Sequence, residues 1–340
     1  MKDKMTLDEY LQKLREKMGK MYYKIWDFSQ IKKAYDEYCE LKGNNAVDIV
    51  DRINLVNVTF FQKNNIENSY FSEFWMVLFD LNEYLLKRIP DNRFFKKKGE
   101  ADAISNAMIL PRLIENTGIK SAKYYLVDWI VDDSIQTYID TFFITPNFLE
   151  KGDELFNLKD IVSSVEMDFG KIEVNLRKEL ELRHFDIENI NSFIEEFRKN
   201  IFLNSFIENT DVSLNNISYI INNKKIRIAP MYDFDFCCGV ESYVDKKIRI
   251  NGSTELTSIL EHYKNDKNFA KWIEEQILTL DIKSIVSENS TLPNRLNISE
   301  NQMQYYIDYF ERRKSIVKDF FDKEKDANDT KKVQSINQNR

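Results

Sequence analysis

Apolar and aromatic positions recur at three- and four-residue steps near the start of the chain, which is the spacing of one helix face. The segments that show it, within residues 6–48, are LDEYLQKLREKMGKMYYKIW and FSQIKKAYDEYCELKGN. They predict two amphipathic helices. We interpret residues 1–48 as a helical N-terminal extension whose aromatic stripe packs on the body of the protein.

From Val56 to about Thr145 the pattern changes to short alternating or β-branched runs, which indicate strands. The expected strands are VNVTFF, FWMVLFD, EYLLKRI, AKYYLVDWIV and QTYIDTFFI. One predicted helix, ADAISNAMILPRLIENTG, interrupts them, and Pro111 within it is expected to kink it or end it early. The pattern predicts a small antiparallel-sheet lobe over residues 49–146.

Beyond Thr145 helical spacing dominates. The expected helices are LFNLKDIVSSV, DIENINSFIEEFRKNIFLNSFIEN, STELTSILEHYK, NFAKWIEEQIL and NQMQYYIDYFERRKSIVKDFFDKEK. They predict a larger, mostly helical lobe over residues 147–325, and the fold class is therefore α+β. Residues 326–340 contain almost no apolar side chains and are expected to form a disordered tail.

Asp211, Asn216 and Asp233 are the strongest chemical signal, because a strand, a turn and a strand separate the third residue from the first two. The runs ISYII and IRIAP flank Asn-Asn-Lys-Lys, which is a hairpin pattern without the usual glycine. Pro230 ends the second strand and leaves Asp233 on an irregular loop. Taken singly, Asp211 could be a turn acid and Asn216 a polar strand entry.

The same Asp-to-Asn spacing occurs a second time, at Asp186 and Asn191. No ribbon of two strands follows that pair, and apolar residues continue at helical spacing instead. Asp186 is therefore better explained as the cap or first-turn acid of a helix.

The set formed by Asp211, Asn216 and Asp233 is similar to the plan of protein kinases. There a catalytic-loop Asp accepts the proton of the substrate hydroxyl, an Asn five residues on binds metal, and a second metal-binding Asp follows a two-stranded ribbon. A kinase also needs a Lys that reaches the α- and β-phosphates and a helix Glu that holds it. Lys87 and Glu100 are the candidates for that pair.

Each of these further assignments has an alternative. Asp102, on the same predicted first turn, could serve in place of Glu100, and Lys87 could be an exposed Lys of an edge strand. The segment QKNNIENSYFSE, where a phosphate-binding loop is expected, contains no glycine. Ser69 and Ser72 could donate hydroxyl hydrogen bonds there, and a plain polar turn is the alternative.

These motifs resemble the HipA-like serine/threonine kinases, whose catalytic segment reads N-T-D-x-H-x-x-N, then a ribbon, then A-P-x-Y-D. The corresponding segments here are NTDVSLNN, over 209–216, and APMYD, over 229–233. The resemblance extends through YLLK, ENTGI and FITPNFLEKGDEL and covers roughly residues 65–240. It implies a bilobal protein-kinase-like fold with a small antiparallel-sheet N-lobe and a larger, mostly helical C-lobe.

The resemblance also implies roles for single residues. Asp211 would be the catalytic base, Asn216 and Asp233 the Mg²⁺ ligands, and Lys87 the phosphate-bracing Lys, with Phe143 to Asn147 near the adenine of ATP. Ser213 departs from the family pattern, because His is common at that position. The predicted helical segment takes the place of the N-terminal domain of full-length HipA toxins, so their antitoxin and operator partnership is not implied.

Composition limits the other function classes. A chain of 340 residues with 43% hydrophobic content can form two lobes. The net charge of −7, from 49 basic and 56 acidic residues, argues against a dedicated nucleic-acid binder. The two His residues have no second ligand at metal-binding spacing, so zinc chemistry is poorly supported.

Three cysteines, of which Cys237 and Cys238 are adjacent, argue against a disulfide framework and for a reducing compartment. The N-terminus is charged throughout, and no run of 18 uncharged apolar residues occurs. We therefore expect a cytoplasmic protein that has no membrane partner, with secretion by a route without a cleavable signal left open.

The resulting hypothesis is an ATP- and Mg²⁺-dependent protein serine/threonine kinase. Its acceptor would be a Ser or Thr hydroxyl of a protein, with the enzyme itself as one candidate. The alternatives are a small-molecule phosphotransferase on the same fold, a nucleotide-binding scaffold without catalysis, and an α+β protein that has no nucleotide site.

Overall fold

The computed structural model describes most of the chain beyond residue 98 and the strands before it. The described residues are 59–61, 74–79, 82–88, 95–97, 99–132, 137–146, 148–150, 152–162, 169–214, 216–242, 255–288 and 298–338. The predicted helices of the N-terminal extension lie outside these residues. The chain divides into two compact units, Met1–Asp91 with Lys123–Phe148 and Asn92–Ala122 with Leu149–Arg340.

The described part of the first unit is a five-stranded sheet in which all neighbouring strands are antiparallel. Its strands are β1 (Thr59–Phe61), β2 (Phe74–Phe79), β3 (Asn82–Arg88), β5 (Tyr125–Asp132) and β6 (Thr137–Pro146), in the order β1-β2-β3-β6-β5. These are the five strands that the sequence predicts. The prediction succeeds because each strand is a β-branched or aromatic run that ends at polar or turn-forming residues.

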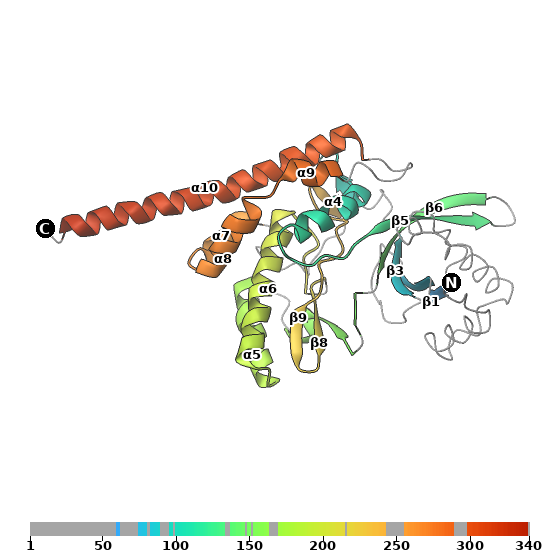
Figure 1. Ribbon diagram of the computed structural model, residues 1–340, viewed down its shortest axis with the longest axis horizontal. Coiled ribbons are helices and arrows are strands. Elements are labelled where there is room, and N and C mark those ends of the chain that lie inside the picture. The colour runs from blue at the N-terminus through green and yellow to red at the C-terminus, as the bar shows by residue number, and fades with distance from the viewer. Residues whose placement is uncertain are drawn as a thin grey trace, which may run out of the picture. The chain divides into compact units, whose positions relative to one another are not determined.

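Helices dominate the second unit (Figure 1). They are α4 (Ala103–Glu115), α5 (Phe169–Leu182), α6 (Ile187–Phe206), α7 (Leu256–Tyr263), α8 (Lys267–Trp272), the π-helical turn η5 (Ile273–Ile277), α9 (Ile282–Glu288) and α10 (Glu300–Gln338). No helix among the described residues combines the length and the apolar character needed to cross a bilayer.

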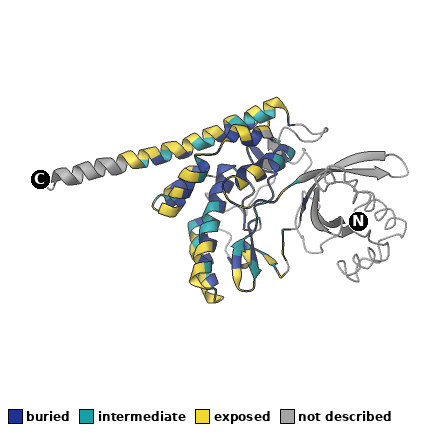
Figure 2. Cartoon of the chain, in the orientation of Figure 1, coloured by how far each residue is buried: buried dark blue, intermediate teal, exposed yellow. Residues whose placement is uncertain are grey.

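Helix α6 carries the core of this unit, because 11 of its 20 residues are buried (Figure 2). Asp186 caps its first turn by accepting a hydrogen bond from the amide of Asn189 at 2.8 Å, as the sequence predicts. Phe202 stacks on Phe206 and meets Trp272 edge-on, with ring centroids 5.6 Å apart in the second pair. These aromatic contacts fix the C-terminal end of α6, from which the next loop starts.

The second unit also contains a three-stranded antiparallel sheet. It consists of β7 (Glu154–Asn157), β8 (Ser218–Asn222) and β9 (Lys225–Ile228), in the order β7-β8-β9. The predicted hairpin of β8 and β9 is confirmed. Its turn residues Asn223 and Lys224 both have positive φ, 47° and 69°, which two-residue hairpin turns of this kind require and which glycine would adopt at lower cost.

Strand β7 corrects the prediction of a helix at LFNLKDIVSSV. Residues 154–157 are extended, and a short 3-10 turn, η4 (Leu158–Asp160), follows them. Phe156 pairs with Tyr219 across β7 and β8, and their rings stack with centroids 5.3 Å apart. Pairing with a strand some 60 residues away thus overrides a local helical pattern.

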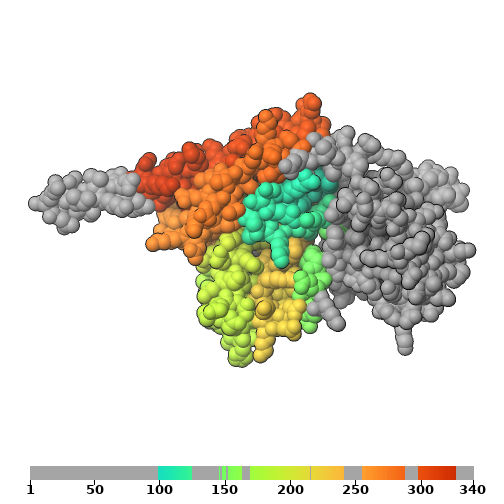
Figure 3. Space-filling model, viewed as in Figure 1, coloured from blue at the N-terminus to red at the C-terminus, as the bar shows by residue number. Residues whose placement is uncertain are grey.

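Helix α4 differs from the prediction in two respects. It runs through Pro111, which is buried, and ends only at Glu115. It also belongs to the second unit, although the sequence places it in the small lobe of residues 49–146. Figure 3 shows α4 beside the C-terminal helices, and the indole of Trp272 donates to the carbonyl of Thr117 at 3.0 Å. Thr117 and Trp272 are 155 positions apart in the sequence, so no local sequence pattern predicts their contact.

Helix α10 extends to Gln338, whereas the sequence predicts a disordered tail from residue 326. Its first half packs along α9 and α7. A packed helix supplies its own nucleus, and each further residue then needs only one backbone hydrogen bond to continue it.

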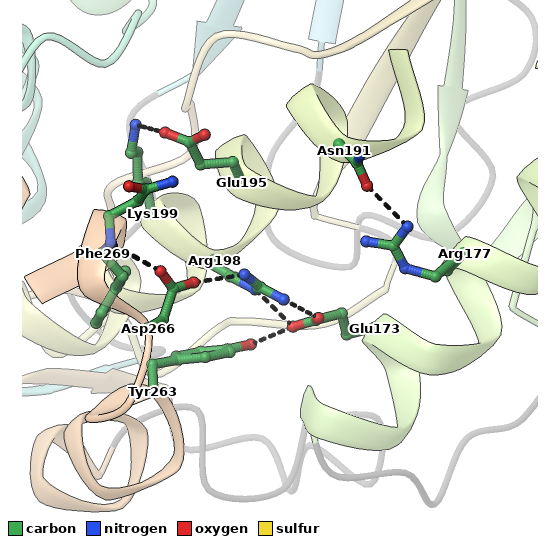
Figure 4. A network of polar contacts seen from close by, with 10 residues as sticks. Glu173, Arg177, Asn191, Glu195, Arg198, Lys199, Tyr263, Asp266 and Phe269 are labelled. Carbon is green, nitrogen blue, oxygen red and sulfur yellow. Dashed lines mark hydrogen bonds and ion pairs between the residues drawn. The ribbon is translucent and has the colours of Figure 1, made fainter. Parts of the chain in front are cut away.

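Arg198 of α6 joins α5, α7 and α8 in a polar network (Figure 4). Its guanidinium donates to both carboxylate oxygens of Glu173 and, at 2.5 Å, to Asp266. Tyr263 also donates to Glu173, at 2.9 Å. The bonds to Glu173 and the charge of Asp266 hold the pKa of Arg198 above its usual value, so the guanidinium stays charged.

We expect Arg198→Met to lower the free energy of unfolding by about 2 kcal/mol, because two partly buried carboxylates lose their cation while residual exposure screens the loss. Urea unfolding followed by circular dichroism measures it. Lys271→Met is the matched control, since Lys271 is 71% exposed and faces Glu275 at 3.7 Å. Equal midpoints for the two variants would contradict a stabilising role for the network.

Candidate active site

The first site loop, Ile207–Asn216, leaves the end of α6 and presents Asp211. The amide of Asp211 donates to Oδ1 of Asn209 at 2.9 Å. The carbonyl of Asp211 accepts from Nδ2 of Asn216 at 2.8 Å. Two carboxamides therefore hold the backbone of Asp211 from both sides, and Oδ1 is the atom of Asn216 that is left to face a cation.

Behind this loop lies a chain of buried carboxamides that the sequence reasoning missed. Asn209 donates to Oδ1 of Asn204 at 2.9 Å, and Asn204 donates to Oδ1 of Asn200 at 2.8 Å. All three residues are at most 5% exposed. Because buried amides must be paired, the chain locks the side chain that binds the Asp211 amide. Asn at two positions four residues apart, within an otherwise apolar face of α6, was the available signal.

The second site loop, Ala229–Cys238, follows β9 and presents Asp233. Its start is held from two sides, because the amide of Met231 donates to the carbonyl of Lys120 at 3.0 Å and the hydroxyls of Tyr232 and Ser218 lie 2.6 Å apart. Asp233 itself has a φ of 64°, the left-handed conformation that costs a residue with a side chain about 1 kcal/mol. Asp and Asn tolerate it best.

Hydrogen bonds join the two site loops directly. The amide and the hydroxyl of Thr210, which is buried, both donate to the carbonyl of Phe236, at 2.8 and 3.1 Å. The amide of Cys238 donates to the carbonyl of Ile207 at 2.9 Å. The residue before Asp211 is thus bonded to the residue three positions after Asp233, so both acids belong to one locally rigid assembly.

The electrostatics of Cys237 support the same grouping. Its thiol is fully buried, and burial is the main reason that its pKa lies well above the usual range. The negative charges of Asp233, Asp235 and Asp211 raise that pKa further. Carboxylates from both site loops therefore act on the same buried atom.

The remaining predicted site residues are distributed differently. Lys87 of β3 lies opposite Phe143 of β6 in the register of the five-stranded sheet. Both belong to the first unit, and their side chains lie outside the described part of the structure. Ser69, Ser72 and Asn147 also lie outside the described residues. Asp211, Asn216 and Asp233 lie in the two hydrogen-bonded site loops of the second unit.

Glu100 corrects a detail of the prediction. It is exposed in a bend ahead of α4 and does not begin the helix. The helix starts at Ala103, because the side chain of Asp102 accepts from the amide of Ser105 at 2.8 Å in a capping box. Asp102, the alternative acid, also accepts from Gln302 at 3.0 Å and is thus engaged as a cap.

The donor set of the two loops fits Mg²⁺ in a nucleotide complex. No group of three or more His, Cys, Asp or Glu side chains suited to a metal ion occurs among the described residues. Mg²⁺ at a nucleotide site needs no such group, because it takes one or two protein oxygens and completes its shell with phosphates and water. Asn216 and Asp233 offer one carboxamide and one carboxylate oxygen.

No protein-family model matches the sequence, and no curated protein does so either. Solved structures do match. A crystal structure of a Helicobacter pylori proinflammatory kinase, CtkA, is 13% identical, with 77% of this chain and 94% of that chain covered and a TM-score of 0.49. The HipA, HipB and operator DNA complex of a Shewanella oneidensis MR-1 toxin–antitoxin system contains a chain that is also 13% identical. There 91% of this chain and 70% of that chain are covered, with a TM-score of 0.43.

At 13% identity and TM-scores below 0.5, these likenesses assign no residue of this chain a role. The hydrogen bonds that position Asp211, Asn216 and Asp233 are those of the two site loops described above.

Proposed function

We propose that the protein is an ATP- and Mg²⁺-dependent phosphotransferase that acts on Ser or Thr hydroxyls of a protein. One observation carries the proposal. Asp211 and Asn216 occupy one loop and Asp233 the next, and Thr210 bonds the two loops together. A hairpin separates the loops, which is the arrangement that phosphoryl transfer by a kinase requires.

In this proposal Asp211 accepts the proton of the acceptor hydroxyl. Its backbone is held by Asn209 and Asn216, so the carboxylate needs little reorganisation when the hydroxyl arrives. Asn216 and Asp233 would hold Mg²⁺, which when bound neutralises charge on the phosphates. Positioning and electrostatics then supply most of the acceleration.

The first unit would supply the nucleotide contacts. Lys87, opposite Phe143 in the sheet, is proposed to bind the α- and β-phosphates, with Ser69 at the phosphates and Phe143 and Asn147 near the adenine. Cys237 and Cys238 are both free thiols, which suits the reducing cytoplasm that we propose as its location. We propose no nucleic-acid or membrane partner.

The experiment is incubation of the purified protein with γ-labelled ATP and generic protein acceptors, with Mg²⁺ or with excess EDTA. We expect label on Ser or Thr of protein only when Mg²⁺ is present. A parallel panel of aminoglycosides, sugars and choline reveals a small-molecule phosphotransferase, which would overturn the protein acceptor. A melting shift with ATP and no transfer would indicate a binding scaffold, and no shift with or without Mg²⁺ would overturn the nucleotide site.

A further inference from the structure

Helix α10 contacts both site loops, or the residues just before them, through one row of polar side chains. The row consists of Tyr305, Tyr306, Tyr309 and Arg313. Tyr309 donates to Glu208 at 2.7 Å, and Arg313 donates to the carbonyl of Phe206 at 3.1 Å, so both serve the first site loop. Tyr305 donates to the carbonyl of Cys238 at 2.8 Å and serves the second.

Tyr306 reaches the second site loop through Asn106 of α4. Its hydroxyl donates to Oδ1 of Asn106 at 2.6 Å. Nδ2 of Asn106 in turn donates to the carbonyl of Cys237 at 3.0 Å and, more weakly, to that of Asp235 at 3.5 Å. These carbonyls lie two and four residues beyond Asp233. Helix α10, helix α4 and the second site loop, which are far apart in the sequence, thus meet through these hydrogen bonds.

The donor and acceptor groups available allow only one direction for each of these hydrogen bonds. The amide group of Asn106 must face the carbonyls, which only accept, and its oxygen therefore faces Tyr306. Tyr306 must then donate its single proton to Asn106, while Ser105 lies 2.9 Å from the same hydroxyl. Both Tyr306 and Asn106 are fully buried, and burial keeps the pKa of the Tyr306 phenol well above its usual value. The phenol therefore keeps its proton at neutral pH.

We propose that Tyr306 and Asn106 are positioning residues that hold the Asp233 loop in its metal-binding conformation. The inference rests on the proposed function, because it assigns Asp233 to Mg²⁺. Asp233 adopts a left-handed backbone conformation that is not its own preference, so the surrounding structure must impose it. Asn106 donates hydrogen bonds to residues that follow Asp233, whereas the hairpin of β8 and β9 precedes it.

Tyr306→Phe removes one hydroxyl and keeps the ring. We expect the Mg²⁺ concentration for half-maximal phosphoryl transfer to rise about fivefold, in line with the net worth of one buried hydrogen bond. The rate at saturating Mg²⁺ should return to that of the wild type, because excess metal restores the loop conformation. A residue that only stabilises the fold would change the melting temperature and leave the Mg²⁺ requirement unchanged.

Tyr263→Phe is the matched control. Tyr263 is also buried, and its hydroxyl donates to Glu173 of α5, outside both site loops. We expect its Mg²⁺ requirement to equal that of the wild type. Hydrogen exchange without metal or nucleotide is the second readout, and peptides covering residues 233–240 should exchange faster in Tyr306→Phe than in Tyr263→Phe.

Equal Mg²⁺ requirements and equal exchange in the two variants would overturn the inference. If wild-type protein transfers no phosphate, the proposed function fails, and the exchange comparison still decides whether Tyr306 holds the loop. Should Tyr306→Phe not fold, Asn106→Leu carries the same test, because Leu has a similar volume and cannot donate to the Cys237 carbonyl.

Discussion

Asp211→Asn is expected to slow phosphoryl transfer by about 10²-fold or more, because the variant loses the group that accepts the proton of the acceptor hydroxyl. Asn matches Asp in shape, and the hydrogen bonds with Asn209 and Asn216 use the backbone amide and carbonyl of residue 211. The loop should therefore keep its conformation. Initial rates with labelled ATP and a protein acceptor measure the effect, and the ATP concentration for half-maximal rate should change little.

The control for Asp211→Asn comes from the second occurrence of the same spacing. Asp186→Asn alters an acid that caps α6 through the amide of Asn189, and Asn caps a helix about as well as Asp. This variant should have the activity and the melting temperature of the wild type. A wild-type rate for Asp211→Asn would remove that residue from the chemistry, whatever the control shows.

Asp233→Asn is expected to lower activity by about 10²-fold at low Mg²⁺, because a neutral carboxamide replaces the anionic ligand opposite charged phosphates. Asn tolerates the left-handed conformation of this position as well as Asp does, so the fold should be retained. The loss should shrink as Mg²⁺ is raised. Initial rates over a Mg²⁺ titration measure this, and a rate and Mg²⁺ dependence equal to those of the wild type would exclude Asp233 as a ligand.

Asp233→Gly separates the side chain from the backbone at the same position. Glycine adopts a φ of 64° without the cost of about 1 kcal/mol that a side chain brings, so the melting temperature should not fall. Activity should be lost as in Asp233→Asn. Lost activity together with a large fall in melting temperature would mean that the carboxylate holds the loop together and does not serve a metal.

The local features of the site could be predicted because their causes lie within a few residues. Asp186 caps the turn that it begins, and the hairpin of β8 and β9 forms between two β-branched runs joined by Asn223 and Lys224. The candidate residues Asp211, Asn216 and Asp233 were visible for the same reason, because their spacing is measured along one short stretch of chain.

The wrong predictions concern features whose causes lie far away along the chain. The local pattern of residues 155–157 is helical, yet these residues pair with β8, which lies some 60 positions further along the chain. The burial of Asn200 and Asn204 was not predicted, because Asn in a helical pattern indicates an exposed position unless its hydrogen-bond partner is known.

Periodicity, caps and turn residues act over a few positions, so they are enough to predict most strands and helices and three side chains suited to a metal and a proton. The hydrogen bonds that join the two site loops through Thr210, and the second loop to Asn106 and Tyr306, arise only from packing. The bond between Tyr306 and Asn106 joins residues 200 positions apart. Such a contact forms only when the chain packs, and no local sequence pattern around either residue predicts it.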